Sequence, residues 1–119
     1  MRILLVDDNV LHLLILRKIF ERGKNEVVVA RNGREALQFL EFDPSFHVIL
    51  TDIQMPVMNG VEFLGQVKES NLTKEIPVIG FTSGDVEYYR NQAGKLFDYL
   101  VPKPFDFSDL YQLAQSAIA

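Results

Sequence analysis

The chain has 119 residues, of which 48% are hydrophobic and 24% are charged, as is ordinary for one globular domain, and we expect that domain to span residues 1–119. Its formal net charge of -4 argues against direct nucleic-acid binding, which needs a basic surface, and the absence of cysteine excludes disulfides and zinc–thiolate sites. The apolar run at residues 3–6 is far too short for a signal peptide or a membrane span, so we expect a cytoplasmic protein without membrane contact.

Short apolar segments predict five β-strands, most of them buried on both faces of a sheet. In chain order they are Ile3–Val6, Glu26–Ala30, Val48–Asp52, Pro77–Thr82 and Phe97–Val101. Apolar residues at helical spacing predict helices between them, at about Val10–Arg22, Arg34–Glu41, Val61–Ser70 and Val86–Ala93. A last helix follows, with Asp106 or Ser108 as its cap.

The first predicted helix comes directly after the acidic stretch at residues 7–9, in which any of the three side chains could serve as the N-cap. Its expected buried face consists of Leu11, Leu14, Ile15 and Ile19. Over the whole chain, strands and helices alternate five times. This alternation predicts an α/β fold, a single doubly wound five-stranded parallel sheet with helices on both faces. The pattern alone does not fix the strand order, and the flavodoxin-like order 2-1-3-4-5 is the one that we expect.

Reactive side chains stand at or just after the ends of four of the predicted strands. In chain order they are Asp7 and Asp8, then Asp52, then Thr82, then Lys103. The carboxyl ends of parallel strands meet at one edge of a sheet, and the first and third strands would flank its switch point. The three aspartates are therefore expected to converge there.

Three crowded carboxylates repel one another, because two of them ~4 Å apart cost on the order of 4 kcal/mol at an effective dielectric constant of ~20. Such a cluster either holds protons or binds a cation, and an all-oxygen site that keeps waters suits Mg²⁺. A carboxylate beside Mg²⁺ can attack a phosphoryl group. Lys103 and the hydroxyl of Thr82 can then bind phosphoryl oxygens. The residue types thus suit phosphoryl chemistry, and we expect Asp52, at the end of the central strand, to be the working residue.

Four separated motifs, in family-like order and spacing, resemble the receiver domain of two-component response regulators, the CheY-like superfamily. They are Asp7-Asp8, Asp52 with Met55-Pro56 and Asn59-Gly60, Thr82-Ser83, and Lys103-Pro104-Phe105. The stretch at residues 30–37 also resembles the start of the family's second helix. The resemblance thus covers the whole chain.

The resemblance implies that Asp52 is the phosphoacceptor and that its donor is a histidine kinase, a histidine phosphotransfer protein or a small molecule such as acetyl phosphate. Lys103 would pair with the phosphoryl oxygens, and Thr82 would move to bond the phosphate. The bond between Lys103 and Pro104 would be cis. The implied ligands of Mg²⁺ are Asp8, Asp52, Asp7 largely through water, and the backbone carbonyl of Gln54.

The resemblance also implies a signalling switch that catalyses only its own phosphorylation and dephosphorylation. The face made by the fourth helix, the fifth strand and the last helix would control an effector domain or protein. A phosphorylation-dependent homodimer on that face is a further expectation.

A few positions depart from the family pattern. Gln54 stands where asparagine is common. Metal binding should tolerate this change, because the ligand would be the backbone carbonyl of the residue. The longer side chain is expected to alter the lifetime of the phosphate. Asn59 replaces the usual aspartate, and Ser83 replaces a frequent alanine. Three positions before the lysine, where the family usually has an aromatic residue, this chain has Leu100, with Tyr99 one residue earlier. Either the fourth helix is shortened and a bulge restores Tyr99 to that position, or the threonine–aromatic switch is altered.

Other functions are open to a chain of this pattern. The main alternative is a Mg²⁺-dependent phosphohydrolase with an aspartyl-phosphate intermediate. Enzymes resembling haloacid dehalogenases have a second aspartate two residues after the nucleophile, where this chain has Gln54. A flavin- or nucleotide-binding domain is disfavoured because no glycine-rich loop follows the first strand. His12 and His47 are expected to be structural or exposed, not phosphate carriers or ligands.

Overall fold

The computed structural model describes residues 1–55, 57–82, 86–93, 97–102 and 107–118. The strands are β1 (Arg2–Val6), β2 (Glu26–Ala30), β3 (Val48–Asp52), β4 (Val78–Thr82) and β5 (Tyr99–Pro102). The helices are α1 (Val10–Arg22), α2 (Gly33–Phe42), α3 (Gly60–Glu69), α4 (Val86–Ala93) and α5 (Phe107–Ile118). None of the helices in the described parts is long and apolar enough to cross a membrane.

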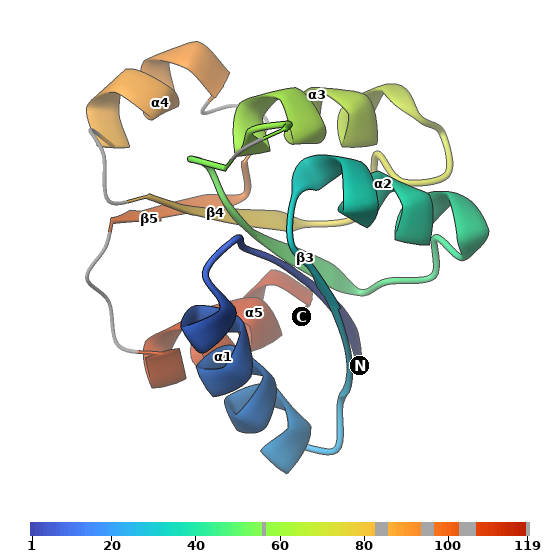
Figure 1. Cartoon of the computed structure of the whole chain (residues 1–119), viewed down its shortest axis with the longest axis vertical. Helices are drawn as coiled ribbons and strands as arrows, with labels where there is room; N and C mark the ends of the chain where they lie inside the picture. The colour runs from blue at the N-terminus through green and yellow to red at the C-terminus, as the bar shows by residue number, and fades with distance from the viewer. Residues whose placement is uncertain (56, 83–85, 94–96, 103–106, 119) are drawn as a thin grey trace.

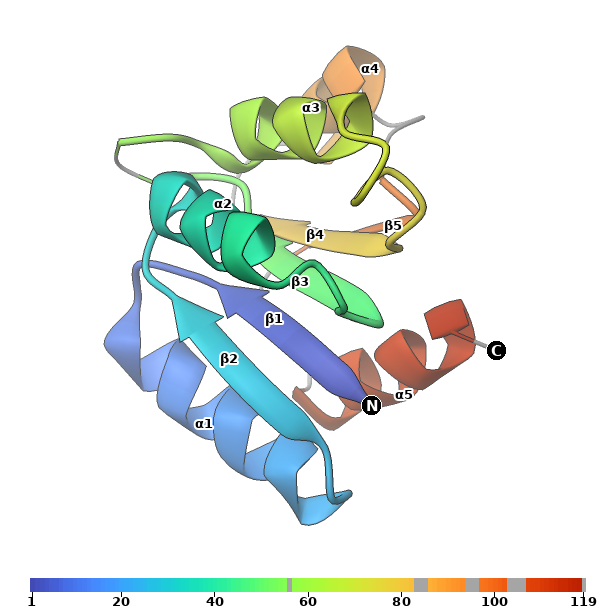
Figure 2. The same ribbon diagram turned by 90° about the vertical axis from the view of Figure 1, so that its right-hand side faces the viewer.

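The strands form one parallel sheet in the order β2-β1-β3-β4-β5. Helices α2, α3 and α4 cover one face of the sheet, and α1 and α5 cover the other (Figures 1 and 2). Every residue of β3 and of β4 is buried, because each of these strands has a neighbour on both sides and helices on both faces. The predicted α/β fold and strand order are confirmed.

Successive side chains of a strand point to opposite faces, so the sheet has a hydrophobic core on each side. The side chains of Leu4 and Ile49 pack with Phe63 and other residues of α2 and α3. Their chain neighbours Leu5 and Leu50 pack instead among residues of α1 and α5. Both cores hold the sheet rigid up to its carboxyl edge.

Helix α1 buries a different face from the one predicted. Leu11 is 63% exposed and Leu14 is 53% exposed, whereas the buried residues are Leu13, Leu16 and Phe20. The sequence from residue 10 to residue 16 is apolar except for His12, so helical spacing alone fits more than one face. Packing against α5 and the sheet selects the face, and the prediction from spacing was wrong.

Asparagine side chains cap three of the helices. Asn9 caps α1, Asn32 caps α2 and Asn59 caps α3, each by accepting a hydrogen bond from a backbone N–H in the first turn. Ser108 is the second residue of α5 and Asp106 lies outside the described residues, so the predicted cap of this helix stays a prediction. The cap of α1 matters for the functional site, because it falls to Asn9 and leaves the two preceding aspartates for other partners.

Candidate metal and phosphoacceptor site

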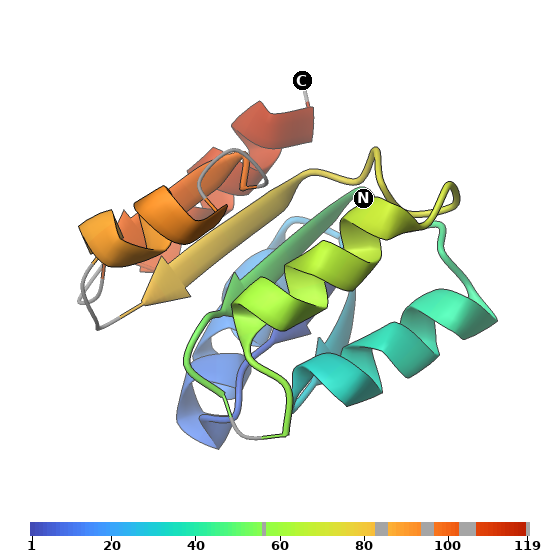
Figure 3. The ribbon, with the colours of Figure 1, turned by 90° about the horizontal axis from the view of Figure 1, so that it is seen from above.

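The carboxyl ends of β1 and β3 lie side by side at one edge of the sheet. The two strands are paired up to Val6 and Thr51, so the residues that follow are brought together across the strand boundary. Figure 3 shows the arrowheads of β3 and β4 at this same edge. The sequence predicts the reactive side chains at this same edge.

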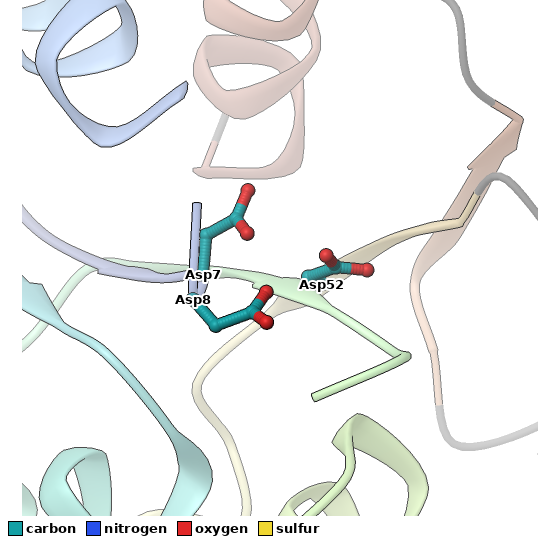
Figure 4. Close-up of side chains that lie close together, drawn as sticks. All are labelled: Asp7, Asp8 and Asp52. Carbon is teal, nitrogen blue, oxygen red and sulfur yellow. The ribbon is translucent and has the colours of Figure 1, made fainter. Parts of the chain in front are cut away.

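Asp7, Asp8 and Asp52 form a compact acidic cluster at this edge (Figure 4). Each offers one carboxylate oxygen, and the three oxygens all lie within 4.8 Å of one another. Asp7 is fully buried, Asp52 is 5% exposed, and Asp8 is exposed to solvent. Oxygen ligands with one side open to water match the preference of Mg²⁺, which usually keeps several of its waters. The predicted convergence of the three aspartates is therefore confirmed, and their donor set fits this ion.

The turn after β1 fixes how the first two aspartates are presented. The side-chain oxygen of Asn9 accepts hydrogen bonds from the N–H groups of Leu11 and His12, at 3.0 and 3.2 Å. The N–H of Asn9 in turn donates to Oδ1 of Asp7 at 3.0 Å. Because Asn9 serves as the cap, the carboxylate of Asp8 is not needed for that role and extends into the cluster.

The segment after β3 is packed tightly against the end of that strand. The N–H of Gly60 donates to the carbonyl of Ile53 at 2.8 Å. A Cβ added to Gly60 would lie 2.6 Å from the carbonyl oxygen of Asp52, so only glycine fits there without a backbone shift. The start of α3 thus holds the backbone of Asp52 in place.

Gln54 and Thr82 approach each other beside Asp52. The N–H of Gln54 donates to Oδ1 of Asp52 at 3.3 Å, and its side-chain oxygen accepts from the hydroxyl of the buried Thr82 at 3.4 Å. Thr82 ends β4, next to β3 in the sheet. Lys103, the remaining predicted site residue, and Ser83 lie outside the described residues.

The register of β5 shows how Tyr99 and Leu100, the two candidates for the position that is usually aromatic in the family, are placed. Four consecutive residue pairs join β4 to β5, from Ile79 with Tyr99 to Thr82 with Pro102, so no bulge interrupts this stretch. Leu100 faces Gly80 and packs against the core on the α3 side, whereas Tyr99 is 39% exposed. Within residues 99–102 no bulge restores Tyr99, while residues 94–96 and 103–106, before and after this stretch, lie outside the described residues. β5 also begins two residues later than predicted, and Phe97, before the strand, is buried against Gly80.

Sequence reasoning missed the position of His12. Its Nδ1 lies 3.2 Å from Oδ2 of Asp7, at the border of the acidic cluster. The signal that could have found it is the cap of α1, because an N-cap at residue 9 turns the first helical turn back toward the end of β1. His47, in contrast, lies at the opposite end of the sheet, where its Nδ1 accepts from the N–H of Arg2 at 2.8 Å.

The geometry defines a class: a doubly wound domain whose switch point gathers three aspartates, with a threonine at the end of the next strand. The family model described as the response regulator receiver domain matches residues 3–115, and the chain belongs to that family. It is a receiver domain of two-component phosphorelay signalling, and this identification from the sequence is confirmed.

The similar proteins agree with this membership. The two-component response regulator ORR3 of Oryza sativa subsp. indica is 37% identical over 118 residues, which are 98% of this chain and 89% of the rice protein. The structure of the chemotaxis protein CheY4 of Vibrio cholerae superposes with a TM-score of 0.89 at 27% identity and covers 98% of this chain and 97% of that one. The response regulator TrrA of Thermotoga maritima, solved in complex with Mg(2+)-BeF, gives a TM-score of 0.84 at 28% identity, again over 98% and 97% of the two chains.

Proposed function

We propose that Asp52 accepts a phosphoryl group from a histidine kinase or a histidine phosphotransfer protein, with Mg²⁺ bound by the acidic cluster. The observation that carries the proposal is the cluster itself, in which Asp52 brings a carboxylate oxygen within 4.8 Å of oxygens of Asp7 and Asp8. The solved complex of TrrA with Mg(2+)-BeF supports the choice of ion. Asp8 and Asp52 would be direct ligands, Asp7 would act largely through water, and the backbone carbonyl of Gln54 would complete the protein ligands.

In this reaction a carboxylate oxygen of Asp52 forms a bond to phosphorus while the bond from phosphorus to the donor's imidazole nitrogen breaks, and the nitrogen keeps the electron pair. Bound Mg²⁺ supplies positive charge for the phosphoryl oxygens. The burial of Asp52 limits water around the acyl phosphate. Lys103 would pair with another phosphoryl oxygen.

Phosphorylation would change the partner of Thr82. Its hydroxyl now donates to the neutral amide oxygen of Gln54 at 3.4 Å. A phosphoryl oxygen on Asp52 is charged and is therefore a stronger acceptor. Thr82 would turn to it, and the shift would bias the packing of Leu100 on β5, because Leu100 fills the place that is usually aromatic in the family.

The proposed output face is formed by α4, β5 and α5, where Tyr88 and Tyr99 are 55% and 39% exposed. An effector domain or protein, or a second phosphorylated copy, would bind there. We propose that residues 1–119 act as one receiver domain in the cytoplasm, where kinases of this kind have their catalytic parts, and that its only catalysis is its own phosphorylation and dephosphorylation.

The test is incubation with acetyl phosphate and Mg²⁺, followed by intact-mass measurement. We expect one added phosphate on the wild-type protein, and none on Asp52→Asn or after removal of Mg²⁺ by a chelator. Asp109→Asn is a matched control, because Asp109 is an exposed aspartate on α5. A phosphate on Asp52→Asn would contradict the assignment, and hydrolysis of many donor molecules per protein would favour the phosphohydrolase alternative.

Lys103→Ala separates metal binding from phosphoryl binding. We expect this variant to bind Mg²⁺ like the wild type but to signal poorly, because the lysine pairs with the phosphoryl group. Loss of Mg²⁺ binding, measured by titration calorimetry, would contradict the role given to Lys103.

A further inference from the structure

His12 lies where the first turn of α1 meets the acidic cluster. The side chain of Asn9 accepts hydrogen bonds from the N–H groups of Leu11 and His12, which fixes the backbone at this turn. The imidazole is 27% exposed, and its Nδ1 lies 3.2 Å from Oδ2 of the fully buried Asp7. The contact thus joins a partly exposed ring to a carboxylate that has no access to solvent.

The direction of this hydrogen bond follows from the acceptor. A carboxylate that binds a cation is ionised and can only accept, so in that state the hydrogen of the bond stands on Nδ1 of His12. The other carboxylate oxygen of Asp7, Oδ1, accepts from the N–H of Asn9 at 3.0 Å. Each carboxylate oxygen of Asp7 thus has a hydrogen-bond partner on this turn, and the two contacts together restrain the plane of the carboxylate.

The ring does not itself belong to the cluster. Among the described residues, the group whose ligand atoms lie mutually within 4.8 Å consists of Asp7, Asp8 and Asp52. His12 contacts that group through Asp7. In metal sites, a partner that hydrogen-bonds a ligand orients it, and losing the partner weakens binding although no ligand is removed.

We propose that His12 is a positioning residue of the cation site: its Nδ1–H holds the carboxylate of Asp7 in the orientation that binds Mg²⁺ together with Asp8 and Asp52. The inference rests on the proposed function of the cluster. Because Asp7 is fully buried, water cannot easily replace the donor that a substitution at His12 removes.

The experiment is a Mg²⁺ titration by isothermal calorimetry at about pH 8. His12→Ala removes the donor, and we expect about a tenfold loss of Mg²⁺ affinity. His12→Asn keeps an N–H near the same place and should recover most of that loss. Leu11→Gln is the matched control, because Leu11 lies on the same turn, is 63% exposed, and should leave the affinity unchanged.

A second measurement separates positioning from a role in the chemistry or in folding. The initial rate of phosphorylation by acetyl phosphate is followed against Mg²⁺ concentration. In His12→Ala the half-saturating Mg²⁺ concentration should rise about tenfold, while the rate at saturating Mg²⁺ should stay that of the wild type.

An unchanged or tighter Mg²⁺ affinity in His12→Ala would overturn the inference, as would a lower maximal rate at an unchanged half-saturating concentration. If His12→Ala does not fold, His12→Leu, which fills the same space without a donor, makes the same prediction. A wild-type protein that binds no Mg²⁺ would overturn the proposed function itself, whereas failure confined to the His12 variants would overturn only the role of His12.

Discussion

Charged side chains are arranged in opposite ways at the two ends of the sheet. At the amino end, the guanidinium of Arg2 lies 3.4 Å from Glu26 and 3.5 Å from Asp43, and 4.0 Å from the centroid of the Phe46 ring. At the carboxyl end, three aspartates place oxygens within 4.8 Å of one another. Opposite charges are paired at one end, and like charges are gathered at the other. One end is arranged for stability, and the other gives up stability in an arrangement that suits the proposed cation site.

The largest effect is expected where α3 packs on the carboxyl end. In Gly60→Ala the new Cβ would lie 2.6 Å from the carbonyl oxygen of Asp52 and 2.8 Å from Cα of Ile53. Backbone atoms cannot move aside easily, so we expect a loss of about 3 kcal/mol in the free energy of unfolding. Urea denaturation measures it.

The control for this substitution lies in the same helix. A Cβ on Gly65 would meet no atom within 4 Å, so Gly65→Ala should instead stabilise the protein by about 0.5 to 1 kcal/mol through helix propensity. Equal effects of the two substitutions would show that the packing of α3 on β3 is looser than the structure has it.

The next effect is expected at the amino end. Arg2→Met removes two ion pairs, the hydrogen bond to the carbonyl of Asp43 and the contact with the Phe46 ring. The side chain is only 20% exposed, so we expect a loss of about 1 to 2 kcal/mol in the free energy of unfolding. Mg²⁺ affinity should not change, because the site is at the other end of the sheet.

Arg17→Met is the matched control for this end. Arg17 pairs with Glu21 at 2.7 Å, but the pair lies on the exposed side of α1, and such pairs contribute about 0.5 kcal/mol or less. If both arginine substitutions had the same small effect in urea denaturation, the amino end would not be the stabilising network described above.

A smaller effect is expected from the backbone of the loop after β3. Val57 has a φ of 69°, a conformation that is costly for a β-branched side chain. Val57→Gly should raise the free energy of unfolding by about 1 kcal/mol, and thermal unfolding can detect the change. Lys24 is the comparison for Val57, because it has a φ of 61° but no branch at Cβ. Lys24→Gly should therefore raise the free energy of unfolding by less than Val57→Gly does. A destabilised Val57→Gly would rule out strain at this position.

The smallest effect is expected in how the free energy of unfolding depends on pH, through Asp43 at the amino end of the sheet. Hydrogen bonds from the hydroxyl and the N–H of Ser45, and then the charge of Arg2, hold the pKa of Asp43 below its ordinary value of 3.8. A carboxylate with a lowered pKa adds stability above its unfolded-state pKa, and this stability is lost as the pH falls through the folded-state value. Between neutral pH and pH values below 3.8, the wild type should therefore lose slightly more stability than Asp43→Asn. Equal acid sensitivity in urea denaturation would contradict this coupling.

Much of the fold and of the cluster could be predicted because the signals are local. An apolar run such as Val48–Leu50 predicts a buried strand, and the aspartate that ends it must lie at the carboxyl edge of a parallel sheet. Asp7 and Asp8 follow their strand in the same way. Once the strand order was assumed, the convergence of the three carboxylates required no further information.

What could not be predicted depends on contacts between distant segments. The buried face of α1 is chosen by α5 and the sheet, since an apolar helix start fits several faces. The contact of Gln54 with Thr82 joins the segment after β3 to the end of β4. The contact of His12 with Asp7 is close in sequence, but it depends on which residue caps the helix, and three candidates were available.

The comparison between the two ends is tested most directly by unfolding the wild type and Asp8→Asn with and without Mg²⁺. Without Mg²⁺ the variant should be more stable by about 1 kcal/mol, because one of the like charges within 4.8 Å is removed. Mg²⁺ at tenfold over its dissociation constant should then stabilise the wild type by about 1.4 kcal/mol and the variant far less. If Asp8→Asn were the less stable protein without Mg²⁺, or if Mg²⁺ stabilised both proteins equally, the three aspartates would not form one cation site.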